Sequence, residues 1–124
     1  NKNNSPIDEP IRKDGETAYF STLPIKALVA ELTKNNIPAA ISNTAGTFVC
    51  NHIMYETLYL SKTKFNNISA GFIHIPYIRE QVKNKPNTPF MELEMIIDAL
   101  KIIIETSAEF YQRNDIKITG GYEH

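Results

Sequence analysis

One stretch, from residue 88 to residue 105, constrains the fold more than any other. Its apolar residues recur at the period of an α-helix: Leu93, Ile96, Ile97, Leu100, Ile103 and Ile104. Charged residues occupy the other side: Glu92, Glu94, Asp98, Lys101 and Glu105. Thr88 is placed to cap this helix and Pro89 suits its first position. A helix with such a long apolar side needs a partner layer of similar length to cover it.

The rest of the chain alternates between strand and helix patterns. Apolar runs at residues 37–42 and 69–75 predict buried strands, with a further short strand at 116–118. Helical spacing is found at 25–32 and at 48–60. Such alternation implies an α/β fold with a parallel sheet flanked by helices. Two or three strands are too few for a sheet of this type, so we expect the sheet to lack some of its strands.

The segments around these elements are polar. Residues 1–18 are predicted to form an irregular polar lead-in. Its residues Ile7 and Ile11 supply enough apolar surface for the lead-in to dock loosely on the surface of the domain. Ser21 or Thr22 is placed to cap the first helix, and Asn35-Asn36 to end it. Residues 77–89 contain Pro86 and Pro89 and predict an exposed loop.

Composition excludes several classes of protein. The 124 residues suit one domain, and 13 basic and 14 acidic side chains give a formal charge of −1 without the basic stripe of a nucleic-acid binder. No run approaches the roughly 18 apolar residues that span a bilayer, so no membrane partner is expected. One cysteine and no leader-like start indicate a reducing cytosol. Because the chain begins with Asn1 and not with methionine, we expect it to be a processed product or a fragment.

Cys50 is the first candidate for catalysis. It follows the small, turn-forming residues 43–47, which separate a predicted buried strand from a predicted helix. The unpaired amides and the positive dipole at a helix start favour a thiolate. The strand–turn–helix frame is also the one that presents nucleophiles in other hydrolases. The alternative is that Cys50 is a small buried apolar residue, which is the commoner role of a lone cysteine.

His74 is the second candidate, near the end of the predicted strand at 69–75. Parallel neighbouring strands would bring its imidazole to the same sheet edge as Cys50, where the two would form a nucleophile and its general base. Read alone, His74 is as readily a residue that hydrogen-bonds the next loop. His52 competes for the role of base, but it points away from Cys50 on a helix. A zinc site at Cys50, His52 and His74 lacks the usual ligand spacing, so no metal is expected.

Three segments resemble the pyroglutamyl peptidase type I (pyrrolidone-carboxylate peptidase) family: residues 18–26 (AYFSTLPIK), 42–51 (SNTAGTFVCN) and 71–77 (GFIHIPY). The cysteine block is the most specific, and residues 6–10 (PIDEP) extend the resemblance towards the start. The resemblance implies a three-layer α/β/α sandwich with a mostly parallel sheet. In this case residues 1–124 are the C-terminal part of a single peptidase domain that lacks its N-terminal strands.

The resemblance also implies an activity. Members of this family are cytoplasmic cysteine exopeptidases, often homotetramers without a cofactor, that remove an N-terminal pyroglutamyl residue from peptides. Cys50 would be the nucleophile, His74 the base, and Phe48 and Val49 part of the pocket for the lactam ring. The glutamate that completes the family's triad lies upstream of the PIDEP segment and has no counterpart here.

Two other interpretations remain open. The chain would be a truncated homologue with impaired or no catalysis that binds a partner, or an unrelated α/β domain with Cys50 and His74 in its core.

Overall fold

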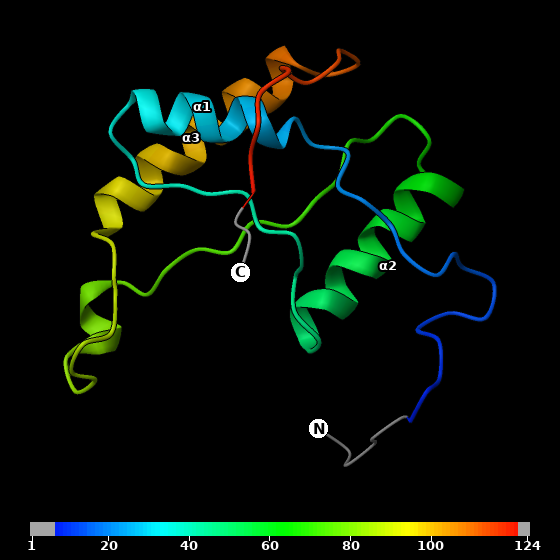
Figure 1. Cartoon of the computed structure of the whole chain (residues 1–124), viewed down its shortest axis with the longest axis horizontal. Helices are drawn as coiled ribbons and strands as arrows, with labels where there is room; N and C mark the ends of the chain where they lie inside the picture. The colour runs from blue at the N-terminus through cyan, green and yellow to red at the C-terminus, as the bar shows by residue number, and fades with distance from the viewer. Residues whose placement is uncertain (1–6, 122–124) are drawn as a thin grey trace.

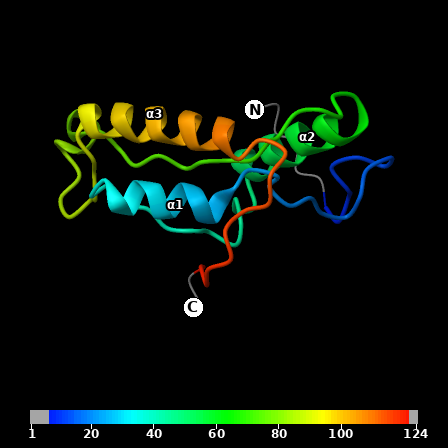
Figure 2. The same ribbon diagram turned by 90° about the horizontal axis from the view of Figure 1, so that it is seen from above.

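Three α-helices and a short 3₁₀ helix form the regular structure of the computed structural model, which describes residues 7–121. These are α1 (Ile25–Lys34), α2 (Val49–Thr63), η1 (Arg79–Val82) and α3 (Leu93–Glu109). Helices α1 and α3 pack side by side, and α2 lies apart from them, joined by long extended segments (Figures 1 and 2). No helix among the described residues is long and apolar enough to cross a membrane.

The buried residues of the helices form two small groups, and Ile37 and Ala70 on the connecting segments are buried as well. One group lies in the α1–α3 pair and contains Ala27, Leu28, Leu32 and Ile96, and the other is on α2, at Tyr55 and Leu58. A core of this size is small for a chain of 124 residues. Much of the apolar surface that the sequence places on helices therefore remains exposed.

Helix α1 forms where the spacing predicts it, but Ser21 and Thr22 do not cap it. Pro24 precedes its first residue, and the side chain that caps it comes from the far end of the chain. The Asp115 carboxylate accepts hydrogen bonds from the backbone N–H groups of Lys26 and Ala27, at 2.9 and 3.0 Å. A carboxylate there satisfies two otherwise unpaired amides and interacts favourably with the helix dipole.

Because Asp115 caps α1, we expect its removal to destabilise the start of this helix. Replacing Asp115 by alanine should destabilise the helix start by about 1 kcal/mol, the usual cost of losing a cap. Hydrogen exchange at the Lys26 and Ala27 amides should accelerate, whereas Asp115→Asn, which keeps one acceptor oxygen, should lose less protection. Unchanged exchange at both amides in Asp115→Ala would contradict this role.

Helix α3 begins later than its sequence signals predict. Thr88 and Pro89 neither cap it nor open it, because Phe90 forms an isolated parallel bridge with Tyr77. The Met91 N–H donates to the Tyr77 carbonyl at 2.9 Å, which keeps the chain extended up to Leu93. The long apolar helix is confirmed, but its predicted cap is wrong.

No strand forms within residues 7–121. The three stretches predicted as strands, 37–42, 69–75 and 116–118, lie in extended segments instead. Among the described residues, no backbone hydrogen bond joins 38–42 or 71–76 to another segment. A strand is stable only when its backbone groups are paired with a neighbouring strand, and within residues 7–121 these segments form no such pairing.

The lead-in is attached to α2 by polar and aromatic contacts. The Tyr59 hydroxyl donates to Asp14 Oδ2 at 2.6 Å, and the Arg12 guanidinium lies 4.0 Å from the centre of the Tyr59 ring. Arg12 also pairs with Glu56 at 3.2 Å. The predicted apolar docking is wrong for Ile7, whose side chain is 79% exposed. Residues 1–6 lie outside the described range.

Asp14 makes this attachment sensitive to pH. The Tyr59 hydroxyl, and then Arg12, lower the pKa of Asp14 below its ordinary value of 3.8. The contribution of ionised Asp14 is therefore present above that value and is lost as pH falls through the lower folded pKa. An NMR titration of the Asp14 carboxyl should show a midpoint below 3.8 that rises in Tyr59→Phe. A midpoint unaffected by Tyr59→Phe would contradict the assignment.

Candidate active site

Cys50 is the second residue of α2, which begins one residue after the predicted start at Phe48. The turn before the helix contains Gly46 at φ 85°, a left-handed conformation that glycine adopts without strain. The thiol is free and half-buried. The helix has no side-chain cap, and its first backbone bond runs from the His52 N–H to the Phe48 carbonyl at 3.2 Å. The backbone N–H of Cys50 therefore lies among the unpaired amides of a helix start.

His74 lies on the extended segment 71–76, which runs past the turn leading into α2 (Figures 1 and 2). Its side chain is exposed, and its ring meets Phe72 edge-on with centroids 5.8 Å apart. Within residues 7–121, no hydrogen bond joins the Cys50 thiol to the His74 imidazole. The fold brings the two segments to one region without forming a bonded pair.

The zinc site considered as an alternative, at Cys50, His52 and His74, is not supported by the described residues. His52 is exposed on α2. No group of three or more His, Cys, Asp or Glu side chains in the described part of the chain could hold a metal ion.

Thr22 and its neighbours hold the beginning of the His74 segment. The Thr22 N–H donates to the Ala70 carbonyl at 2.8 Å, and the Ala70 N–H donates to the Thr22 hydroxyl oxygen at 2.7 Å. A Cβ on Gly71 would lie 2.3 Å from Ser21 Oγ, so only glycine fits without a shift of Ser21. The sequence signal, a Ser-Thr pair before a helix, was interpreted as a cap. The Thr22 hydroxyl instead bonds to Ala70, 48 residues along the chain, and the Ser21 hydroxyl donates to the Ala70 carbonyl at 3.4 Å.

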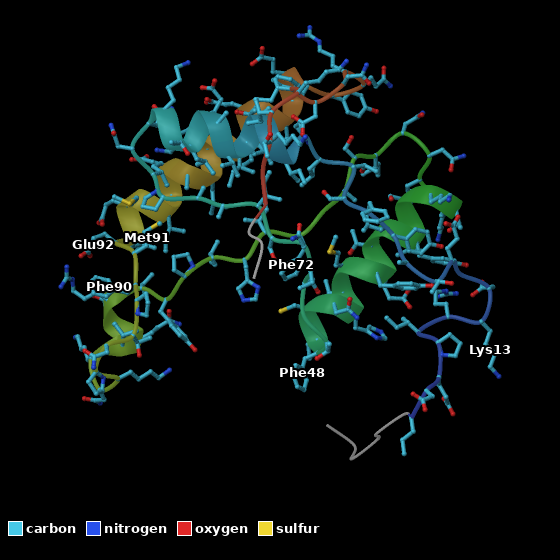
Figure 3. All side chains as sticks on the ribbon, viewed as in Figure 1. Lys13, Phe48, Phe72, Phe90, Met91 and Glu92 are labelled. Carbon is cyan, nitrogen blue, oxygen red and sulfur yellow. The ribbon has the colours of Figure 1, made fainter. Side chains whose placement is uncertain are left out.

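Phe48 and Val49, the expected pocket residues, are 84% and 69% exposed. Phe48 lies at the tip of α2 and points away from the rest of the chain, whereas Phe72 lies on the segment that crosses the middle (Figure 3). The region thus contains a thiol at a helix start and an accessible imidazole, the types of group that serve as nucleophile and general base in acyl transfer, together with exposed apolar side chains.

Comparison with known proteins shows the family to which this chain belongs. The pyroglutamyl peptidase family model matches residues 1–110. The chain is 58% identical over 121 residues to the pyrrolidone-carboxylate peptidase of Clostridium perfringens, and 62% identical over 107 residues to that of Brachyspira hyodysenteriae. The chain belongs to the pyroglutamyl peptidase family.

Solved structures agree with this assignment. The pyrrolidone carboxyl peptidase from Thermococcus litoralis matches 92% of the chain with a TM-score of 0.85 and 44% identity. The pyroglutamyl peptidase I from Bacillus amyloliquefaciens matches 96% with a TM-score of 0.86 and 44% identity. The chain therefore has the arrangement of the corresponding part of these α/β peptidases.

The match covers only part of each relative. The chain spans 56% of the length of the C. perfringens relative and 53% of the B. hyodysenteriae relative. It covers 55% of each of the two solved chains. The rest of each relative lies outside its match with this chain.

Proposed function

We propose that this chain supplies the nucleophile and the base of a cysteine exopeptidase that removes an N-terminal pyroglutamyl (5-oxoprolyl) residue from peptides. The observation that carries the proposal is the 98% coverage of this chain by a pyrrolidone-carboxylate peptidase of 58% identity. Residues 1–124 then form the C-terminal part of a single peptidase domain, a three-layer α/β/α sandwich with a mostly parallel sheet. Homotetrameric assembly, a cytoplasmic location and cofactor-free catalysis belong to the same proposal.

Cys50 and His74 perform acyl transfer in this proposal. His74 accepts the thiol proton, and the Cys50 sulfur attacks the pyroglutamyl carbonyl carbon. The backbone N–H of Cys50 donates to the oxyanion, an interaction worth about 3 kcal/mol. The carbon–nitrogen bond breaks as the imidazolium returns its proton to the leaving amine. Water then attacks the thioester, releasing pyroglutamate and restoring the thiol.

Phe48 and Val49 line the pocket for the lactam ring. Their exposure, at the residues just before the nucleophile, supports this role because a ring held there would bring its carbonyl to the start of α2. A small ring with one apolar face suits a pocket that is mostly apolar and has few polar groups. Substrate binding would bury surface that this chain leaves accessible.

A completed domain tests the proposal. It joins the part of the C. perfringens relative that precedes its matched segment to the front of this chain, and it is assayed with pyroglutamyl-aminomethylcoumarin. We expect turnover, with alanyl-aminomethylcoumarin as the control substrate that is not cleaved. A folded completed domain without turnover would overturn the proposal.

The alternative is a truncated homologue with impaired or no catalysis that acts through a partner. The expectation that the family's triad glutamate has no counterpart in residues 1–124 motivates it, because loss of the equivalent carboxylate in a serine triad costs about 10⁴ in rate. Turnover by the 124-residue chain assayed alone would reject the alternative. Turnover by the completed domain supports the exopeptidase, whereas a folded completed domain without turnover supports an impaired homologue.

A further inference from the structure

The segment that carries His74 is bonded to other parts of the chain at its two ends. Before it, the Ala70 N–H donates to the Thr22 hydroxyl oxygen at 2.7 Å. After it, the Tyr77 carbonyl accepts a hydrogen bond, at 2.9 Å, from a backbone N–H just ahead of α3. Between these two points, no backbone hydrogen bond among the described residues joins 71–76 to another segment. The position of His74, in the middle of this segment, therefore depends on how the two ends are held.

Thr22 holds the first end with three hydrogen bonds to one residue. Its N–H donates to the Ala70 carbonyl at 2.8 Å, and its hydroxyl donates to the same carbonyl at 3.1 Å. The hydroxyl oxygen also accepts the Ala70 N–H at 2.7 Å. Ala70 is buried, and a buried N–H that loses its partner is costly to leave unpaired. Because two of the three bonds use the hydroxyl, deleting that one group releases most of this anchor.

The residues just before Thr22 are attached to α2, the helix that carries the candidate nucleophile. The Tyr19 ring meets the Tyr55 ring edge-on with centroids 5.0 Å apart, and the Tyr55 hydroxyl donates to the Glu16 carbonyl at 2.7 Å. Thr22 follows Tyr19 by three residues, a length of chain that spans at most about 11 Å. One short stretch, which runs from α2 towards α1, thus contacts both the helix with the thiol and the segment with the imidazole (Figure 1).

We propose that Thr22 is a positioning residue for the acyl transfer described above: by holding Ala70, it fixes where the His74 imidazole stands relative to the Cys50 thiol. Thr22 contacts neither of these reacting groups and acts only through the segment. This role depends on the proposed function, because it takes His74 as the base. A general base works within about 3 Å of the proton that it accepts, so a shift of the segment by about 1 Å removes much of its effect.

Hydrogen exchange and NMR of the 124-residue chain test the anchor itself. Thr22→Val keeps the shape of the side chain and removes the hydroxyl, so exchange at the Ala70 amide should accelerate about tenfold and the His74 ring signals should shift. Thr22→Ser keeps the hydroxyl and should preserve both. Thr63→Val is the matched control, because the Thr63 hydroxyl donates to the Tyr59 carbonyl within α2 at 2.8 Å. Its loss should leave the exchange of Ala70 and the signals of His74 unchanged.

Turnover of the completed domain tests the connection to the reaction. Thr22→Val should lower kcat about tenfold and change KM less than about twofold, because proton transfer is impaired and the lactam pocket is untouched. Thr22→Ser should keep kcat within about threefold of the parent. In a His74→Gln background, Thr22→Val should lower kcat no further, because a residue that acts through His74 has no effect once the imidazole is gone.

Unchanged Ala70 exchange and unchanged His74 ring signals in Thr22→Val would overturn the role of Thr22. An equal loss of kcat in the parent and in the His74→Gln background would also overturn it, because such a loss reflects general damage to the structure. A folded completed domain that does not turn over removes the proposed function instead. The exchange and ring signals of the 124-residue chain then decide on their own whether Thr22 holds the His74 segment.

Discussion

Replacing Cys50 by serine in the completed domain is expected to reduce pyroglutamyl hydrolysis by a factor on the order of 10⁴ or more. The serine hydroxyl is a far weaker nucleophile at neutral pH than a thiol activated by an imidazole. The substitution changes one atom of a half-buried side chain at the start of α2, so the fold should remain intact. The measurement is kcat/KM with pyroglutamyl-aminomethylcoumarin.

The control for Cys50→Ser is the free energy of unfolding of the same protein. A stability within about 0.5 kcal/mol of the parent shows that lost turnover reflects chemistry rather than unfolding. Retained activity in a stable Cys50→Ser variant would remove Cys50 from the mechanism.

His74→Gln in the completed domain should reduce kcat by a factor on the order of 10³, within the range for a lost general acid–base group. Glutamine keeps the polarity of the position but cannot take the thiol proton. The His74 side chain is exposed and its only described ring contact is with Phe72, so little stability should be lost. The pH profile should also change, because the step that depends on imidazole is gone.

His52→Ala is the matched control for His74→Gln. His52 is the other histidine near Cys50, and it is exposed on α2. We expect its removal to change kcat less than about threefold, as is usual for an exposed side chain away from the chemistry. A large loss in His52→Ala together with retained activity in His74→Gln would exchange the two assignments.

Local sequence patterns predicted the helices well and their ends poorly. The 3.6-residue spacing located α1, α2 and α3 because an apolar side is a property of the segment itself. The ends depend on distant groups. Asp115, far along the chain, caps α1 in place of Ser21 or Thr22, and Tyr77 holds Phe90 and Met91 extended ahead of α3.

The strands could be located as apolar runs, but their pairing could not be predicted. Pairing requires a strand in register alongside, and among the described residues no backbone hydrogen bond pairs segments 38–42 and 71–76 with another segment. The sequence also predicts a shortage of strands, because the apolar side of the last helix exceeds what two or three strands can cover. Leu93, Ile97 and Ile104 are exposed, and the missing strands stay a prediction.

The sequence predicted which residue types form the candidate site and in which order they follow along the chain. Cys50 after a glycine turn and His74 on the next apolar run follow from the strand–turn–helix frame, and α2 does begin beside Cys50. The anchoring of the His74 segment by Thr22 could not be predicted, since it depends on a backbone contact between residues 48 apart. The roles of Cys50, His74, Phe48 and Val49 remain predictions.

Mass spectrometry of the acyl-enzyme tests the central claim, that Cys50 carries the pyroglutamyl group during turnover. The completed domain is mixed with a pyroglutamyl ester, quenched in acid within one turnover and digested. The account predicts a mass increase of one pyroglutamyl group on the peptide that contains Cys50, and no such increase in Cys50→Ser. Turnover with no adduct on that peptide, or with the adduct on another residue, would contradict it.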